Sequence, residues 1–216
     1  MQDFVERERN FTRDVSHELR SAITVIKMAS ELLGTSSTDA QAPLLDKINR
    51  ASKDMQELTE FFLILAREES LETRQSSILV NDIVSAEADK LSLMSAQKDV
   101  PIIIEHEAQC RVKAPEKVLS VLIGNVLRNS LLYTEAGKVT VSISAQRLCV
   151  LDTGIGISQE KLATIFDCFE RGEGHSQDGF GIGLSIVKRL CNKFHWSLDL
   201  ASEKHKGTNI SIAFSP

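Results

Sequence analysis

Apolar side chains recur at heptad spacing over the first part of the chain. They are Phe4, Phe11, Val15, Ala22, Ile26, Ala29 and Leu33. Steps of seven, or of three and four, place these residues on one narrow stripe of an α-helix, which is typical of a coiled-coil seam. Gly34 ends this pattern and a polar loop follows. The same spacing returns in Ile48, Ala51, Met55, Leu58, Phe62 and Leu65, so the sequence predicts a helical hairpin.

A single hairpin of this kind buries only one stripe of each helix. A chain segment of about 70 residues in two helices is marginally stable alone. Two copies can close a four-helix bundle that covers both seams. We therefore expect residues 1–70 to form a homodimer. The charged, aperiodic segment from Arg67 to Ser76 is typical of a linker, so that residues 71–76 would join this domain to a second one over residues 77–216.

The second part of the chain mixes two periodicities. Helices are expected over residues 80–97, 115–132 and 180–194, and strands over residues 101–105, 139–144, 147–152, 197–201 and 208–214. Helices mixed with hairpins in this way predict an α/β sandwich, in which helices cover one face of a sheet.

Composition excludes several classes of protein. The chain has 216 residues with a formal net charge of -5 and only 5% aromatic residues, which argues against nucleic-acid binding. No apolar stretch approaches the roughly 18–20 residues that span a bilayer, so we expect no membrane contact by this segment. The four cysteines are scattered without a C-x-x-C pair. A disulfide framework or thiolate metal site is therefore not expected, and a reducing cytosol fits best.

His17 is the first candidate for chemistry. On a helix it lies about 200° around from Val15, and therefore points away from the predicted seam. A solvated imidazole has a pKa of ~6.5, so its neutral nucleophilic form dominates at pH 7. The adjacent Glu18 can accept a hydrogen bond from the other ring nitrogen and fix the tautomer. Alone, an exposed histidine beside a glutamate more often has no function.

Two glycine clusters form a second constellation. Asp152 ends a predicted strand and is followed by Gly154 and Gly156. A carboxylate there can accept a hydrogen bond from an exocyclic amine, which favours base recognition over phosphate binding. The second cluster, residues 179–184 (GFGIGL), leads into a helix whose free N–H groups can bind an anion. Each cluster alone could be an ordinary tight turn.

A polar segment lies between the glycine clusters. Residues 170–178 (ERGEGHSQD) contain two glycines, which is typical of a lid over a ligand, although a plain surface loop has the same composition. Arg171 at its start could reach a terminal phosphate as a bidentate donor.

Two asparagines add a possible metal site. Asn125 and Asn129 are four residues apart and share one helix face. An amide oxygen can complete the shell of a Mg²⁺ ion that also holds phosphate oxygens. The alternative is that both amides bind neighbouring backbone groups.

These segments, in this order, resemble the conserved boxes of the catalytic core of two-component sensor histidine kinases. The similar segments are SHELRSAIT at 16–24 (H-box), NVLRNSLLYT at 125–134 (N-box), DTGIGI at 152–157 (first glycine box), 165–169 (F-box), GFGIGLSIV at 179–187 (second glycine box) and the pair Gly207-Thr208. The resemblance implies a dimeric antiparallel four-helix bundle joined to an ATP-binding α/β sandwich of the Bergerat (GHKL) type.

The resemblance also implies a role for each matching residue. His17 would accept the phosphoryl group, Glu18 would orient it or accept its proton, and Ser21 would place a water for dephosphorylation of the partner. Asn129 would bind Mg²⁺, with Asn125 in support, and Asp152 would accept from the adenine amino group. The other expected nucleotide contacts are Arg128, Tyr133, Gly154, Gly156, Arg171, Gly179, Gly181, Gly183, Leu184 and Thr208.

The implied activity is autophosphorylation of His17 by Mg²⁺-ATP, followed by transfer to an aspartate of a separate response regulator. The chain would be the cytoplasmic segment of an inner-membrane-anchored bacterial sensor. Three segments depart from the pattern, since Ser21-Ala22 stands where Thr-Pro is common, Leu132 where a basic residue is common, and Cys168 where proline or arginine is common. The first two keep open a nucleotide-responsive dimeric scaffold without transfer activity. A further alternative is a protein serine kinase of the same superfamily, in which His17 is incidental.

Overall fold

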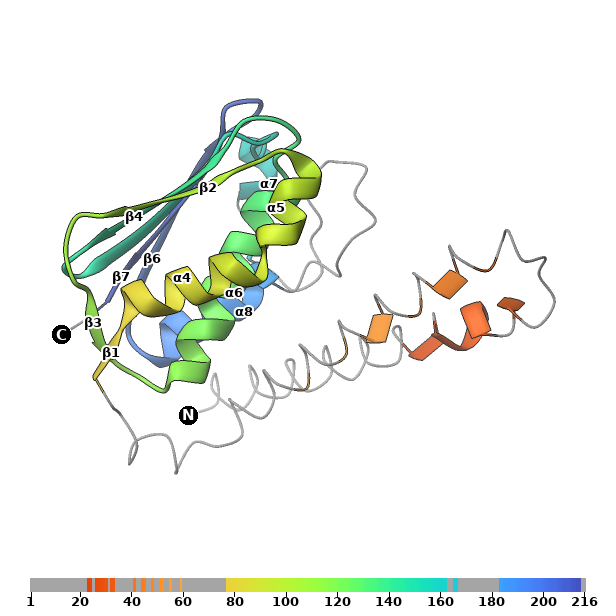
Figure 1. Ribbon diagram of the computed structural model, residues 1–216, viewed down its shortest axis with the longest axis horizontal. Helices are drawn as coiled ribbons and strands as arrows, with labels where there is room; N and C mark the ends of the chain where they lie inside the picture. Colours follow the sequence, from red (N-terminus) through yellow and green to blue (C-terminus); the bar gives the residue numbers. More distant parts are fainter. Residues whose placement is uncertain are drawn as a thin grey trace. The chain divides into compact units, whose positions relative to one another are not determined.

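The computed structural model divides the chain into two compact units, Met1–Ala66 and Arg67–Pro216 (Figure 1). Its described residues are 23–24, 26–30, 32–33, 41, 44–45, 48, 51–52, 55, 59, 77–162, 165–166 and 183–214. The two units are taken in turn below, each by itself.

All described residues of the first unit are helical. Ala29 and Ala51, both on the expected seam, are buried at 3% exposure within a single chain. A second set of large apolar side chains remains about half exposed, namely Ile23, Met28, Leu32 and Leu45. Four further seam positions are half-buried, namely Ile26, Leu33, Ile48 and Met55, and the others, including Phe4, Val15, Phe62 and Leu65, lie outside the described residues.

The second unit is built on a five-stranded sheet with the order β2-β4-β5-β7-β6. The strands are β2 (Ile102–His106), β4 (Val139–Ser144), β5 (Arg147–Asp152), β6 (Ser197–Glu203) and β7 (Gly207–Ala213). β2 pairs with β4 in parallel, and the other three pairs are antiparallel. The parallel pair follows from the connection, because a long helix lies between these two strands in the chain.

The helices cover one face of this sheet (Figure 1). They are α4 (Val80–Lys90), α5 (Ser92–Lys98), α6 (Glu116–Leu132) and α8 (Gly183–Lys193), with the single turn α7 (Gln159–Leu162) beside β6. α6 contacts both α4 and α8. The alternate residues Val139, Val141 and Ile143 of β4 are fully buried beneath the helices, which confirms the expected two-layer sandwich.

The structure differs from the expected elements in the helix over residues 80–97, in two short strands and in the single turn α7, none of the last three being predicted. The helix expected over residues 80–97 is interrupted at Leu91, whose N–H donates to the carbonyl of Ala88 at 3.0 Å. The strands β1 (Ser77–Leu79) and β3 (Arg111–Lys113) form a small antiparallel pair that was not predicted. Three residues are too few to show an alternating pattern, so the sequence carried no signal for either strand.

The C-terminal end of α6 is held by a lysine from a neighbouring helix. Lys98 Nζ donates to the carbonyls of Leu131 and Leu132 at 2.7 Å each. A cation is favourable there, since the carbonyls at a helix C-terminus have no intrahelical donors and carry the negative end of the helix dipole. This cap fixes the point at which the chain leaves α6 and enters the turn at Tyr133.

The described residues contain no helix long and apolar enough to cross a membrane. Within that same part of the chain, no three His, Cys, Asp or Glu side chains gather as a metal site. Burial raises the pKa of Cys110 to about 11 and that of Cys191 to about 12. These thiols therefore stay protonated and pack as core residues.

Candidate functional site

The two asparagines of α6 lie against the first residue of α8. A Cβ placed on Gly183 would lie 2.9 Å from Asn125 Oδ1 and 3.1 Å from Asn129 Nδ2. α6 and α8 approach this closely because Gly183 has no side chain. The structure therefore brings together both amides and the last glycine of the second glycine box.

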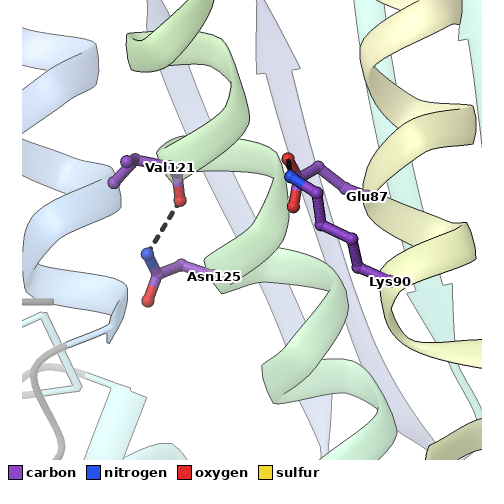
Figure 2. A network of polar contacts seen from close by, with 4 residues as sticks. All are labelled: Glu87, Lys90, Val121 and Asn125. Carbon is purple, nitrogen blue, oxygen red and sulfur yellow. Dashed lines mark hydrogen bonds and ion pairs between the residues drawn. The ribbon is translucent and has the colours of Figure 1, made fainter. Parts of the chain in front are cut away.

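Asn125 has a buried oxygen with no partner. Its Nδ2 donates to the carbonyl of Val121 at 2.7 Å, so the side chain folds back along its own helix (Figure 2). The residue is 8% exposed, and Oδ1 makes no hydrogen bond within the described part of the chain. A buried acceptor of this kind is costly unless a ligand uses it. The amide oxygen is thus available to a hard cation.

Asp152 lies at the C-terminal end of β5 and is 4% exposed. Its Oδ1 accepts backbone hydrogen bonds from Gly154 N at 2.9 Å and from Thr208 N at 3.0 Å. Burial raises the pKa of this carboxyl above its usual 3.8, and the two N–H groups and the nearby Ser130 hydroxyl oppose that shift. Both backbone N–H groups bind Oδ1, so neither of them occupies Oδ2.

The first glycine box packs directly on the end of α6. The carbonyl of Tyr133 accepts a hydrogen bond from Ile155 N at 3.1 Å. A Cβ on Gly154 would lie 2.3 Å from that carbonyl oxygen, so only glycine fits here. This contact sets the turn that follows Asp152 against the helix that carries Asn125 and Asn129.

The second glycine of the box has a conformation that favours glycine. Gly156 has φ +65, and a Cβ there would lie 2.0 Å from the carbonyl oxygen of Glu203. The nearby N–H of Ile157 donates to Ser202 Oγ at 2.9 Å. The box is therefore anchored to β6 as well as to α6.

The remaining predicted contacts fall into two groups. Arg128 is half-buried on α6 between the two asparagines, Leu184 is half-buried in the first turn of α8, and Thr208 is buried on β7 beside Asp152. The other predicted site residues lie outside the described residues: His17, Glu18, Ser21, Arg171, Gly179 and Gly181.

Sequence reasoning missed two polar residues of the site. Ser130 follows Asn129 on α6 and has a buried hydroxyl, and Ser202 on β6 bonds to the loop after Asp152. Ser130 had a signal in the sequence, because it is a polar residue among the buried apolar positions of α6. Ser202 had none, since its role depends on the pairing of β6 with β7.

Two kinds of recognition follow from this arrangement. Near the start of α8, amide groups and a helix N-terminus suit a cation with phosphate oxygens. At the end of β5, a buried carboxylate suits an amino group. Both lie along α6, so one ligand that carries a phosphate chain and an amino-substituted base can use both.

Two family models match the chain. Residues 7–71 match the His Kinase A (phospho-acceptor) domain, and residues 114–216 match the histidine kinase-, DNA gyrase B- and HSP90-like ATPase domain. Sensor protein QseC of Escherichia coli (strain K12) is 31% identical over 219 residues, covering 96% of this chain and 48% of that protein. Sensor histidine kinase YkoH of Bacillus subtilis (strain 168) is 26% identical over 227 residues, covering 100% of this chain and 49% of that protein. The chain spans about half the length of these curated relatives.

Solved structures share the fold. The Acinetobacter baumannii histidine kinase AdeS superimposes with a TM-score of 0.71 at 17% identity, over 92% of this chain and 97% of that one. Full-length ShkA, solved in complex with AMPPNP, gives a TM-score of 0.66 at 22% identity, over 96% of this chain and 46% of that one. These likenesses agree with the helical hairpin and α/β sandwich expected from the sequence.

Proposed function

Because the chain belongs to the two-component sensor histidine kinases and carries their catalytic core, we propose that it binds Mg²⁺-ATP, phosphorylates His17 and passes the phosphoryl group to a response regulator. The observation that carries this proposal is the geometry of Asp152. A buried carboxylate whose Oδ1 is already used by two backbone N–H groups has Oδ2 ready for the adenine amino group.

The second glycine box and the two asparagines would hold the phosphates. Asn129 is proposed as the Mg²⁺ ligand, and the unpartnered Oδ1 of Asn125 supports a cation at this position. The cation would neutralise charge on the phosphate oxygens. Leu184, Gly179, Gly181 and Gly183 are proposed to place backbone N–H groups near the phosphates, with Arg128 and Arg171 as cationic donors.

Residues of the H-box would carry out the phosphoryl transfer itself. The neutral imidazole of His17 would attack the γ-phosphorus, a nitrogen–phosphorus bond would form, and the bond to the leaving ADP oxygen would break. Glu18 would take the proton from the ring nitrogen or orient it. The phosphoryl group would then move to an aspartate of a separate receiver protein, and Ser21 would position a water that hydrolyses this phosphoaspartate to aspartate and inorganic phosphate.

The domain limits that go with this function are residues 1–70 for phosphotransfer, 71–76 for the linker and 77–216 for ATP binding. The family matches over 7–71 and 114–216 support this division. We also place the segment on the cytoplasmic side of a membrane-anchored sensor, since its relatives include named sensor proteins about twice its length.

Phosphate incorporation tests the proposal. The chain is incubated with Mg²⁺ and γ-labelled ATP, and wild type is compared with His17→Gln. We expect acid-labile, base-stable label in the wild type and none in His17→Gln, whereas the matched control His106→Gln keeps it. Acid-stable label on a partner protein would instead indicate a serine kinase. Nucleotide binding without any label would indicate a scaffold.

The homodimer is proposed to form through the apolar set on the first unit. Ile23, Met28, Leu32 and Leu45 are each about half exposed in a single chain. A second copy would remove this surface from water, at a gain of roughly 25 cal/mol for each Å² buried.

Introducing charge at this surface is expected to separate the protomers. In the double variant Met28→Glu/Leu32→Glu, two carboxylates would have to be buried without partners. Light scattering should show a mass near 24 kDa for the variant and twice that for the wild type. Leu93→Glu, which changes a 70% exposed leucine on α5, is the control and should remain dimeric. A dimeric double variant would place the interface elsewhere.

A further inference from the structure

Ser130 has a buried hydroxyl that the fold itself does not use. The residue lies on α6 directly after Asn129 and is 3% exposed. Its Oγ makes no hydrogen bond within the described residues. It lies close enough to the Asp152 carboxylate to lower the pKa of that carboxyl. A buried hydroxyl without a partner is costly, which points to a ligand that completes it.

The hydroxyl of Thr208, whose N–H binds Asp152, already forms a hydrogen bond with Ser202. Ser202 Oγ donates its single hydrogen to the carbonyl of Gly207 at 2.8 Å and accepts from Ile157 N at 2.9 Å. Its contact with Thr208 Oγ1 at 2.9 Å must therefore use the hydrogen of Thr208. As a result the Thr208 hydroxyl has no hydrogen left to donate to a ligand. The Ser130 hydroxyl still has one.

We propose that Ser130 takes part in adenine recognition by donating a hydrogen bond to ring nitrogen N1, while Asp152 accepts from the adjacent amino group. This inference rests on the proposed ATP-binding function. The pairing edge of adenine presents an amino donor beside a ring-nitrogen acceptor, and guanine presents the reverse, a carbonyl acceptor beside an N–H donor. The carboxylate matches the amino donor of adenine and opposes the carbonyl of guanine, and the Ser130 hydroxyl supplies a donor for N1 of adenine.

Nucleotide analogues test this contact in the full 216-residue chain. ADP is compared with 1-deaza-ADP, in which a C–H group replaces N1, by isothermal titration calorimetry. Wild type should bind ADP about three- to tenfold more tightly than 1-deaza-ADP, the range expected for one hydrogen bond. Ser130→Ala should bind both ligands equally, at the lower affinity. The control is Ser85→Ala, whose hydroxyl donates to the carbonyl of Asn81 on α4, away from the site.

A structural role for Ser130 would give a different result. Because its hydroxyl has no partner among the described residues, Ser130→Ala should keep or raise the denaturation midpoint of the wild type. An equal loss of affinity for both ligands would mean that the serine shapes the pocket, and would overturn the inference. Unchanged ADP binding in Ser130→Ala would also overturn it. Failure of wild type to bind ADP at all would instead refute the proposed function.

Discussion

Replacing Asp152 with asparagine is expected to weaken ADP binding by about a hundredfold while leaving the fold intact. The asparagine oxygen can still accept from Gly154 N and Thr208 N, as Oδ1 of the carboxylate does at 2.9 and 3.0 Å. The amide nitrogen then takes the place of Oδ2, and a donor faces the amino group of the base. Loss of a charged acceptor together with donor–donor opposition is worth roughly 3 kcal/mol. Calorimetric titration with ADP measures it directly.

The resistance of Asp152→Asn to urea is the control for loss of the fold. Burial raises the pKa of Asp152, so ionisation of this carboxyl opposes folding at pH 7. Asp152→Asn removes that cost and should be at least as resistant to urea as the wild type at pH 7. The advantage should shrink as the pH falls through the raised pKa toward 3.8. Asp199→Asn, an exposed position on β6, should bind ADP like the wild type. Unchanged ADP affinity in Asp152→Asn would remove Asp152 from the base contact.

The sequence predicted the parts of the site whose chemistry is carried by local patterns. Asp152 was assigned because it ends a predicted strand and precedes two glycines, and the structure places it at the end of β5 with Gly154 N bound to it. Asn125 and Asn129 were assigned by their spacing of four on one helix. Their contact with Gly183 could not be predicted, because it depends on how α6 packs on α8.

Long-range pairing explains what the sequence could not predict. The second hydrogen bond to Asp152 comes from Thr208, 56 residues further along the chain, and exists because β7 pairs with β5. The commitment of the Thr208 hydroxyl to Ser202 likewise needs the β6–β7 hairpin. The parallel pairing of β2 with β4 left no local pattern either. Such relations arise from topology, and a single sequence shows only the residue types that topology will bring together.

Gly154→Ala is the second change with a large expected effect. A Cβ on Gly154 would lie 2.3 Å from the carbonyl oxygen and 2.9 Å from the carbonyl carbon of Tyr133. Both are backbone atoms at the end of α6, which Lys98 also holds in place, so neither can rotate away. The loop after Asp152 must therefore shift, and the hydrogen bond from Ile155 N to the Tyr133 carbonyl must lengthen. We expect a loss of about 2–3 kcal/mol in unfolding free energy.

Urea denaturation monitored by tryptophan fluorescence measures this loss of stability in the second unit, which contains Gly154. Trp196 is the only tryptophan, and it is buried between Phe194 and Phe214 in the second unit. The matched control is Gly124→Ala in the middle of α6. Its new Cβ would lie 3.0 Å from the carboxylate oxygen Oε2 at the flexible end of Glu87, which pairs with Lys90 (Figure 2). That carboxylate can move, and alanine favours the helix, so Gly124→Ala should be neutral or stabilising.

ADP affinity also distinguishes the Gly154→Ala variant from the Gly124→Ala control. The shift of the loop in Gly154→Ala displaces the backbone that orients Asp152, so ADP affinity should fall by at least about tenfold even where the protein is fully folded. Gly124→Ala leaves this loop untouched and should bind like the wild type. Equal stability and equal ADP affinity in Gly154→Ala and the wild type would show that the contact between the glycine box and the end of α6 is not needed. The position of Asp152 would then have to depend on Thr208 alone.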